Sequence, residues 1–268
     1  MAERIFELQG VGYHYPPDRP ALRDVSLTVD AGDAMTILGA NGSGKSTLLK
    51  ILDGLVSPTS GTVRAFGTTL TEAALELNRS EFARYFRRRV GLVFQDADSQ
   101  LFSPVVREEV AFAPLQMGLS QEETRTRVED ALSLLGIAHL KDRSPQALSE
   151  GEKRKVAIAS VLSGNPDVLL LDEPSSDLDP RTRVWLQEFL GELHRSGKTI
   201  VTATHDLELA SETSERCMVL DEEHGVAIAD RTERVLEDLD LLLRANLIHQ
   251  HAHRHGTLVH THPHAHED

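Results

Sequence analysis

Cysteine is almost absent from this chain of 268 residues, which contains one, Cys217. A single cysteine excludes an internal disulfide framework and is typical of a protein from a reducing compartment. Basic residues are also scarce, because 28 Lys and Arg stand against 42 Asp and Glu and give a net charge of −14. Broad binding to a nucleic-acid backbone needs an excess of basic residues, so we do not expect it, although the local basic cluster Arg87–Arg89 remains.

Long apolar runs are absent as well, since none approaches the roughly 18 residues that a membrane-spanning helix needs. The N-terminus, Met1–Ile5, lacks the basic and apolar regions of a secretory signal. We therefore expect a cytoplasmic protein that reaches a membrane only through a partner. With 40% apolar and 26% charged residues, the composition is typical of one large globular domain, with or without a small appendage.

The hydrophobic pattern predicts two strands between residues 4 and 29, joined by a proline-rich turn. After them, short apolar strands alternate with segments of helical periodicity. We expect strands at 35–38, 90–94, 168–171 and 199–204, a hairpin at 217–220 and 226–229, and helices from 45, at 70–89, 122–135, 151–162 and 181–194, from 207, and at 234–247. This alternation predicts an α/β fold with a mostly parallel sheet.

A glycine-rich loop follows the strand at 35–38. Residues 39–46, GANGSGKS, match the pattern G-x-x-x-x-G-K-S/T between a strand and a helix, the context that the motif requires. Glycines let successive backbone N–H groups point at phosphate oxygens, and the helix start adds its positive end. Lys45 is expected to neutralise β- and γ-phosphate charge and Ser46 to hold Mg²⁺. A chance glycine-rich turn is the alternative.

Two carboxylates, Asp172 and Glu173, end the apolar strand at 168–171. Nucleotides bind at the carboxyl ends of strands in open α/β sheets. We expect Asp172 to hold Mg²⁺ through water and Glu173 to take a proton from an attacking water molecule. A solvated acidic strand end is the alternative, which the phosphate motif makes less attractive.

A third motif, LSEGEK at residues 148–153, lies between these two. It resembles the LSGGQ signature of the ATP-binding cassette (ABC) ATPases, with Glu150 at the first glycine and Glu152 at the glutamine. The resemblance implies that Ser149 and Gly151 contact the γ-phosphate of an ATP held by a second subunit, at a helix start that suits an anion. Glu150 departs from the pattern and brings a carboxylate near a phosphate unless it points away.

Further matches extend the resemblance over roughly residues 4–230. Gln95 resembles the Q-loop glutamine that reaches Mg²⁺, Asp179 lies in a segment similar to the D-loop, and His205 resembles the switch histidine at the γ-phosphate. Tyr15 lies where the family stacks an aromatic ring on adenine, and Tyr13 on the same strand face is its rival. The resemblance implies ATP binding by Tyr15, Gly39, Ala40, Asn41, Gly42, Ser43, Gly44, Lys45, Ser46, Thr47 and Gln95, catalysis by Glu173 and His205, Mg²⁺ binding by Ser46, Gln95 and Asp172, and contacts to the partner-bound ATP from Ser149, Gly151 and Glu152.

The resemblance implies a P-loop NTPase core of mostly parallel sheet, with an antiparallel β subdomain and a helical signature subdomain. We expect the ABC ATPase domain over residues 1–240, its helical subdomain over about 95–163, and a His-rich tail over 241–268. The implied activity is ATP hydrolysis by a homodimer, or by a heterodimer with a paralogue, around two MgATP. Its implied partners are integral membrane transport subunits and a substrate-binding component, on the cytoplasmic side of the cell membrane.

Residues 96–102, DADSQLF, directly follow Gln95. A Q-loop followed by Asp-x-Gln-Leu-Phe is similar to the energy-coupling-factor importers, whose ATPases drive uptake of vitamins or of nickel and cobalt. Residues 106–112, VREEVAF, and Pro114–Leu115 continue that pattern. The loop of an ordinary ABC importer is the alternative.

Histidine dominates the chain from residue 249 onward. Eight of the 13 histidines lie there, mostly at i, i+2, which places them on one face of an extended chain: His249, His251, His253, His255, His260, His262, His264 and His266. Imidazole binds Ni, Co, Zn and Cu, and interposed residues such as Pro263 distinguish the segment from a purification tag. The tail resembles the His-rich ends of nickel/cobalt importer ATPases, so we expect Ni²⁺ or Co²⁺ binding and uptake. A merely solvated tail is the alternative.

Two other functions remain as alternatives to nickel or cobalt uptake. One is an ABC importer ATPase for a vitamin or another substrate. The other is a non-transport ABC ATPase that acts on nucleic acid. Relatives of the second kind carry a long coiled coil between phosphate loop and signature, for which the separation of Lys45 and Ser149 is too short, or fuse two cassettes. We therefore expect no nucleic-acid partner.

Overall fold

The computed structural model describes residues 3–76, 80–255 and 258–265, and for residues 250–255 and 258–265 this description covers the backbone. Its contacts divide the chain into two compact units: residues 1–71 with 201–268 form unit 1, and residues 72–200 form unit 2. The division falls inside strand β8 (Thr199–Thr204). This division differs from the expected boundary between the ATPase domain, residues 1–240, and the His-rich tail, residues 241–268, and that boundary stays a prediction.

Unit 1 contains an antiparallel sheet whose strand order is β2-β1-β4-β5. The strands are β1 (Arg4–Tyr15), β2 (Arg19–Asp30), β4 (Ser60–Ala65) and β5 (Thr68–Thr69). Phe6 of β1 faces Val29 of β2 and Ala65 of β4, and all three side chains are buried. The hairpin of β1 and β2 confirms the two strands expected between residues 4 and 29, whereas β4 and β5 were not predicted.

A second sheet of unit 1 carries the glycine-rich loop. Strand β3 (Ala34–Leu38) pairs in parallel with β9 (Arg216–Leu220), and β9 pairs in antiparallel fashion with β10 (Val226–Arg231). Every residue of β3 is buried, as expected for a parallel strand covered on both faces, whose sequence is continuously apolar. Two helices continue the predicted strand–helix alternation: α1 (Lys45–Leu52) after β3, and α8 (Leu207–Thr213) after β8.

Two predicted helices differ from the structure. The helix expected at 70–89 is confined to α2 (Glu81–Arg89), because the Ser80 side chain accepts a hydrogen bond from the Ala83 N–H and starts the helix there. Residues 77–79 of that expectation lie outside the described residues. The helix expected at 234–247 is two helices, α9 (Thr232–Glu237) and α10 (Leu239–Arg244). Asp238 separates them, since its side chain caps α10 and competes with a continuous helix.

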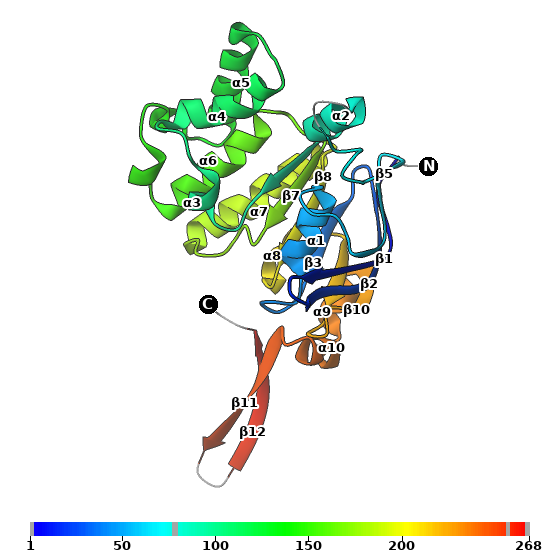
Figure 1. The fold of residues 1–268 in the computed structure, drawn as a ribbon. Helices are drawn as coiled ribbons and strands as arrows, with labels where there is room; N and C mark the ends of the chain where they lie inside the picture. Colours follow the sequence, from blue (N-terminus) through cyan, green and yellow to red (C-terminus); the bar gives the residue numbers. More distant parts are fainter. Residues whose placement is uncertain (1–2, 77–79, 256–257, 266–268) are drawn as a thin grey trace. The chain divides into compact units, whose positions relative to one another are not determined.

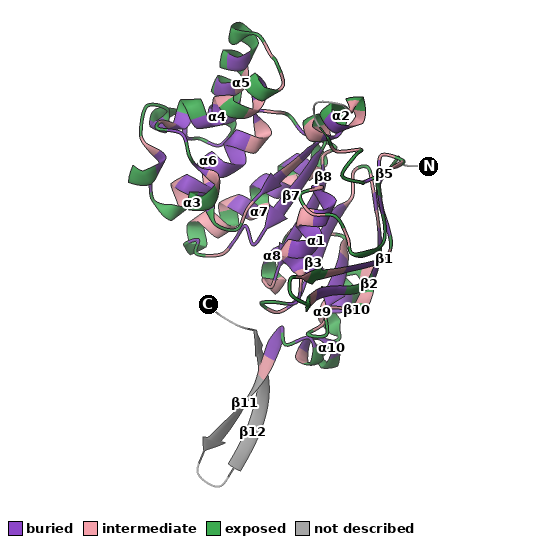
Figure 2. Cartoon of the chain, viewed as in Figure 1, coloured by how far each residue is buried: buried purple, intermediate pink, exposed green. Residues whose placement is uncertain are grey.

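Unit 2 combines parallel strands with a group of helices. Strands β6 (Val90–Val93) and β7 (Val168–Asp172) pair in parallel, and all five residues of β7 are buried. The helices are α3 (Ala97–Gln100), α4 (Val106–Gln116), α5 (Gln121–Leu134), α6 (Glu150–Leu162) and α7 (Pro180–Arg195) (Figure 1). Three of them confirm predictions to within two residues; α3 and α4 were not predicted. Much of α6 is buried (Figure 2).

The histidine-rich end forms a hairpin in unit 1 that follows α10 (Figure 1). Its strands β11 (Ile248–His255) and β12 (Leu258–Ala265) are antiparallel and place His249, His251 and His253 opposite His264, His262 and His260. His266 lies outside the described residues. Within the part of the chain that the structure describes, no helix is both long and apolar enough to cross a membrane.

Candidate functional site

The glycine-rich loop between β3 and α1 has a backbone that only glycine adopts readily. Gly42 and Gly44 have φ angles of +86° and +111°. A Cβ atom on Gly44 would lie 2.1 Å from the carbonyl oxygen of Ala21, and one on Gly39 would lie 2.4 Å from the Ser43 Oγ. Side chains are therefore excluded where the chain must expose its N–H groups to a phosphate, so the loop fits a nucleotide.

Lys45 is the first residue of α1 and is 5% exposed. Its Nζ donates hydrogen bonds to the carbonyl oxygens of Gly39, at 2.7 Å, and Ala40, at 3.2 Å. The ammonium group thus lies over the loop whose phosphate charge it was predicted to neutralise. Because two hydrogen bonds already hold the Lys45 ammonium group at the loop, the side chain needs little reorganisation to contact a bound phosphate.

Tyr15 and Tyr13 compete for the role of adenine-stacking residue. The Tyr15 hydroxyl lies 3.1 Å from the Thr47 Oγ1 on α1, whereas Tyr13 packs edge-on against the Tyr15 ring, with centroids 4.9 Å apart. The structure therefore places Tyr15 against the first turn of α1, directly after the phosphate loop. His224 also touches this loop, because its Nδ1 lies 3.3 Å from the Ser43 carbonyl oxygen.

The predicted carboxylates end strand β7 in unit 2. Asp172 is 5% exposed and Glu173 is 2% exposed. Glu173 has a φ of +42°, an unusual conformation for a residue with a side chain, of the kind that clusters at functional sites. Carboxylate and hydroxyl oxygens are the ligands that Mg²⁺ prefers, so Asp172 in unit 2 and Ser46 in unit 1 each carry an oxygen of a type that suits that ion.

The signature motif forms the start of α6. Ser149 caps this helix: its Oγ accepts from the Glu152 N–H at 3.4 Å, and the Glu152 carboxylate accepts from the Ser149 N–H and Oγ, both at 2.9 Å. Those hydrogen bonds, the backbone one first, lower the pKa of Glu152. Glu150 points at Lys153, whose Nζ lies 2.9 Å from its carboxylate. The carboxylate that departs from the signature is therefore paired with a cation. Gly151 lies close to α7, since a Cβ there would be 3.3 Å from the Thr182 Oγ1.

Gln95 is exposed and its backbone is held by a residue that the sequence did not suggest. The Arg154 guanidinium donates through Nη2 to the Gln95 carbonyl oxygen at 2.6 Å and through Nη1 to that of Phe94 at 2.8 Å. The only sequence signal for Arg154 is its position directly after the signature segment at residues 148–153. Asp179 caps α7, and its hydrogen bond from the Thr182 hydroxyl is the main cause of its lowered pKa.

The predicted switch histidine, His205, lies in unit 1. It is half-buried and directly follows strand β8. No group of three or more His, Cys, Asp or Glu side chains that could hold a metal ion occurs among the residues whose side chains are described. The histidines of the C-terminal hairpin from His251 onward fall outside that set, so their metal binding stays a prediction.

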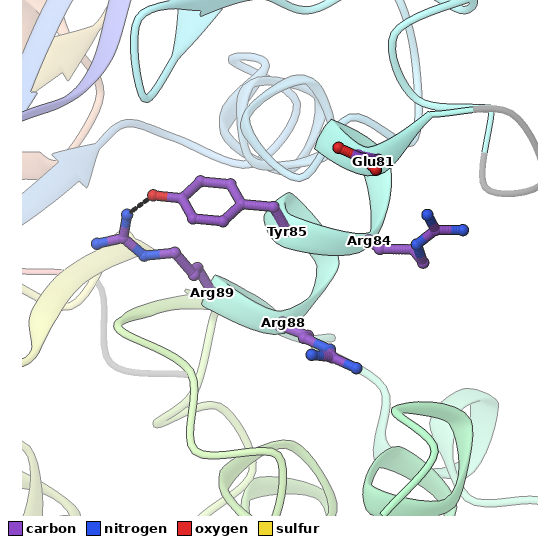
Figure 3. Close-up of a pocket in the computed structure, with 5 residues that line it drawn as sticks. All are labelled: Glu81, Arg84, Tyr85, Arg88 and Arg89. Carbon is purple, nitrogen blue, oxygen red and sulfur yellow. Dashed lines mark hydrogen bonds between the residues drawn. The ribbon is translucent and has the colours of Figure 1, made fainter.

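Helix α2 carries a surface pocket that contains none of the predicted site residues. The pocket is lined by Glu81, Arg84, Tyr85, Arg88 and Arg89 (Figure 3). Arg89 donates to the Tyr85 hydroxyl, and Arg88 donates to the carbonyl oxygen of Met117 at 2.8 Å. The local basic cluster seen in the sequence is thus partly used in contacts within unit 2.

Comparison with known proteins agrees with these motifs. The family model for ABC transporters matches residues 22–176, and the chain belongs to this family of ATPases, which hydrolyse ATP to power transport. An ABC transporter ATP-binding protein of Methanosarcina acetivorans is 52% identical to this chain, over 94% of this chain and 92% of the length of that protein. The nickel import ATP-binding protein NikO of Rhodobacter capsulatus is 45% identical over 91% and 95%. The energy-coupling factor transporter ATP-binding protein EcfA of Methanothermobacter thermautotrophicus is 40% identical over 91% and 76%.

Two solved structures have the same fold. One is cbiO1 from Clostridium perfringens, part of the ABC transporter complex cbiONQ, with a TM-score of 0.77, 34% identity and coverage of 91% of this chain and 95% of that chain. The other is the ATP-binding cassette MJ0796 as a dimer bound to ADP and phosphate after hydrolysis, with a TM-score of 0.76, 29% identity and coverage of 85% and 99%. The expected α/β fold of an ABC ATPase is therefore confirmed, and the chain is the ATP-binding subunit of an ABC transporter.

Proposed function

We propose that this chain is the ATP-hydrolysing subunit of an energy-coupling-factor importer that takes up nickel or cobalt ions. Its similarity to a nickel import protein supports the ion. Its similarity to an energy-coupling factor transporter ATP-binding protein and the segment DADSQLF after Gln95 support the type of importer. The observation that carries the ATPase role is the loop geometry at Gly44 and Lys45. A vitamin or another substrate is the competing cargo.

Binding and hydrolysis of ATP are proposed to use the predicted residues as follows. Lys45 exchanges its bonds to the loop carbonyls for phosphate oxygens, while the loop N–H groups donate to the same phosphates. Ser46, Asp172 and Gln95 hold Mg²⁺, which neutralises phosphate charge when bound. Glu173 accepts the proton of the attacking water as the bond from the γ-phosphorus to its bridging oxygen breaks, and His205 steadies the γ-phosphate.

The substitution Glu173→Gln tests this mechanism. A glutamine keeps the size of the side chain but accepts no proton, so we expect normal binding of a fluorescent ATP analogue and turnover reduced to background. Glu129→Gln on α5 is a matched control, because it removes a carboxylate whose side chain is 69% exposed. Turnover at the wild-type rate by Glu173→Gln would refute the general-base role.

Dimerisation is proposed to place Ser149 and Gly151 of one subunit on the ATP of the other, in a homodimer or with a paralogous subunit. With Glu173→Gln and MgATP, light scattering should report a dimer that disappears when MgADP replaces MgATP. A second substitution, Gly151→Asp, brings a like charge to the phosphate and should abolish that dimer without weakening ATP binding by the monomer.

An exposed aromatic pair on unit 2 is the proposed docking surface for the membrane subunits. Phe102 and Phe112 are 64% and 44% exposed, and their rings pack edge to face with centroids 5.0 Å apart. Large exposed apolar groups mark interaction surfaces, and docking here would hold the chain at the cytoplasmic side of the cell membrane. Phe102→Ser should reduce co-purification of the membrane subunits, whereas Leu134→Ser, which changes a side chain that is 54% exposed on α5, should not.

The C-terminal hairpin is proposed to bind Ni²⁺ or Co²⁺. Its register sets three pairs of histidines directly across from one another, and residues opposite one another in an antiparallel pair have Cβ atoms about 4.5–5.5 Å apart. Equilibrium dialysis of the full chain against Ni²⁺ should lose binding when His251, His253, His260 and His262 become Gln. His139→Gln, which changes an exposed histidine elsewhere, is the control. Unchanged binding would leave the hairpin a solvated tail.

Uptake decides between the cargoes. The complex reconstituted with its membrane subunits should accumulate radiolabelled Ni²⁺ or Co²⁺ in an ATP-dependent manner. Uptake of a vitamin without metal uptake would favour the alternative importer. Stimulation of the ATPase by nucleic acid, without uptake of either, would favour the non-transport reading.

A further inference from the structure

The segment that carries Gln95 is anchored by side chains instead of by strand or helix hydrogen bonds. The Phe94 N–H donates to the Gln100 Oε1 at 3.0 Å, and the carbonyl oxygens of Phe94 and Gln95 accept from Arg154 at 2.8 and 2.6 Å. Gln100 in turn donates to the Ala157 carbonyl oxygen at 3.0 Å. Both anchors therefore lead to the same helix, α6.

Arg154 is suited to this task by its burial and shape. It is 5% exposed. Burial lowers the pKa of its guanidinium, and the negative charges of Asp177 and Glu150 act in the opposite direction and raise that pKa. Arginine nevertheless stays charged in proteins, and its planar fork can meet two carbonyl oxygens at once, which an ammonium group cannot do with the same geometry. Hydrogen bonds from a charged donor are the strong ones, so the two contacts hold the backbone firmly.

The same helix begins with the signature serine. Ser149 caps α6 through its exchange of hydrogen bonds with Glu152, and Lys153 binds Asp98 of α3 at 2.8 Å. Arg154 is thus five residues from Ser149, on a helix whose first turns hold both α3 and the Gln95 backbone. Hydrogen bonds and the first turns of α6 thus join the Gln95 backbone to the signature serine.

We propose that Arg154 is a positioning residue that fixes the path of the Q-loop backbone against the signature helix, so that Gln95 and Ser149 keep their places relative to each other during turnover. The proposal rests on the proposed roles of those two residues. It adds a residue that neither the motifs nor the resemblance singled out. An arginine that merely fills the core is the simpler explanation, and it makes different predictions.

The test is a double-mutant cycle on the full chain. Arg154→Met keeps an unbranched apolar stem but is shorter than arginine and donates no hydrogen bond. We expect it to lower kcat about 10- to 100-fold, as a misplacement of about 1 Å does, with KM for ATP changed less. In the Gln95→Ala background the same substitution should change kcat by less than about threefold, because residues that act through one another are not additive. Arg125→Met, which removes an arginine that is 74% exposed on α5, is the matched control.

Unfolding followed by the fluorescence of Trp185, the only tryptophan, separates positioning from stability. The proposal would be overturned if Arg154→Met had the wild-type kcat. It would also be overturned if the kcat of the double variant fell by the product of the reductions in the two single variants, Arg154→Met and Gln95→Ala. Should Arg154→Met not fold, Arg154→Lys carries the test, since it keeps the charge but not the fork. Failure of the proposed function would appear differently, as a wild-type chain with no ATPase activity.

Discussion

Two glycines of the phosphate loop offer a sharp test of the structure because they differ in one respect. Gly42 and Gly44 both have positive φ angles, +86° and +111°. No atom lies within 4 Å of a Cβ built on Gly42, whereas one on Gly44 would lie 2.1 Å from the Ala21 carbonyl oxygen and 2.9 Å from the Leu22 Cδ2. Alanine at either position is strained, but only at Gly44 does it collide with the backbone of β2.

The expected costs follow from these observations. A left-handed backbone costs a residue with a Cβ about 1–2 kcal/mol, and this applies to Gly42→Ala alone. Gly44→Ala adds an overpacking cost of about 1–3 kcal/mol, which brings its total to about 2–5 kcal/mol. At roughly 2–4 °C per kcal/mol for chains near this size, Gly44→Ala should melt about 2–12 °C below Gly42→Ala.

Thermal unfolding without nucleotide and titration with a fluorescent ATP analogue together measure this difference. If the loop moves to relieve the collision, the cost appears as weaker binding, with about a tenfold loss for each 1.4 kcal/mol. Equal melting temperatures together with equal affinities for the two variants would refute the reasoning, because the collision at Gly44 would then cost nothing in either state.

Two further predictions concern titratable groups. The pKa of Glu152 is lowered from 4.5, so the carboxylate stabilises the start of α6 above pH 4.5 and this stabilisation is lost as the pH falls through the lower folded-state pKa. The difference in melting temperature between the wild type and Glu152→Gln should therefore shrink in acid. A difference that grows in acid would contradict the cap. Cys217 is 1% exposed, and burial raises the pKa of its thiol. A thiol reagent should therefore label Cys217 far more slowly in the native protein than in denaturant. Equal labelling rates would contradict its burial.

Much of the site could be predicted from the sequence because its chemistry is local. The loop at 39–46, the carboxylates after the strand at 168–171 and the helix start at Ser149 are each recognisable within a few consecutive residues, where glycine, apolar runs and capping residues constrain the backbone directly. The strands β3 and β7 were found for the same reason, since continuous apolar runs are buried on both faces.

The predictions failed where distant contacts or single side chains decide. The helix expected at 70–89 starts only after its cap, Ser80, and the one expected at 234–247 is divided at Asp238, because a side-chain cap competes with helix periodicity. Strand β4 pairs with β1, a partner remote in sequence, and β5 pairs in turn with β4. Helix α3 has four residues, too few to show a helical period, and α4 contains Pro114, a residue that interrupts a helical pattern in the sequence.

The sequence by itself determined which residues are able to bind ATP, because backbone freedom at glycine, the charge of Lys45 and the acidity of Asp172 and Glu173 are properties of consecutive residues. Only the tertiary structure decided that Lys153 also meets Asp98 of α3 and that Arg154 holds the backbone of Gln95. A side chain on α6 can meet a carbonyl oxygen almost sixty residues away only after folding has brought them together, and burial then makes the hydrogen bond between them strong.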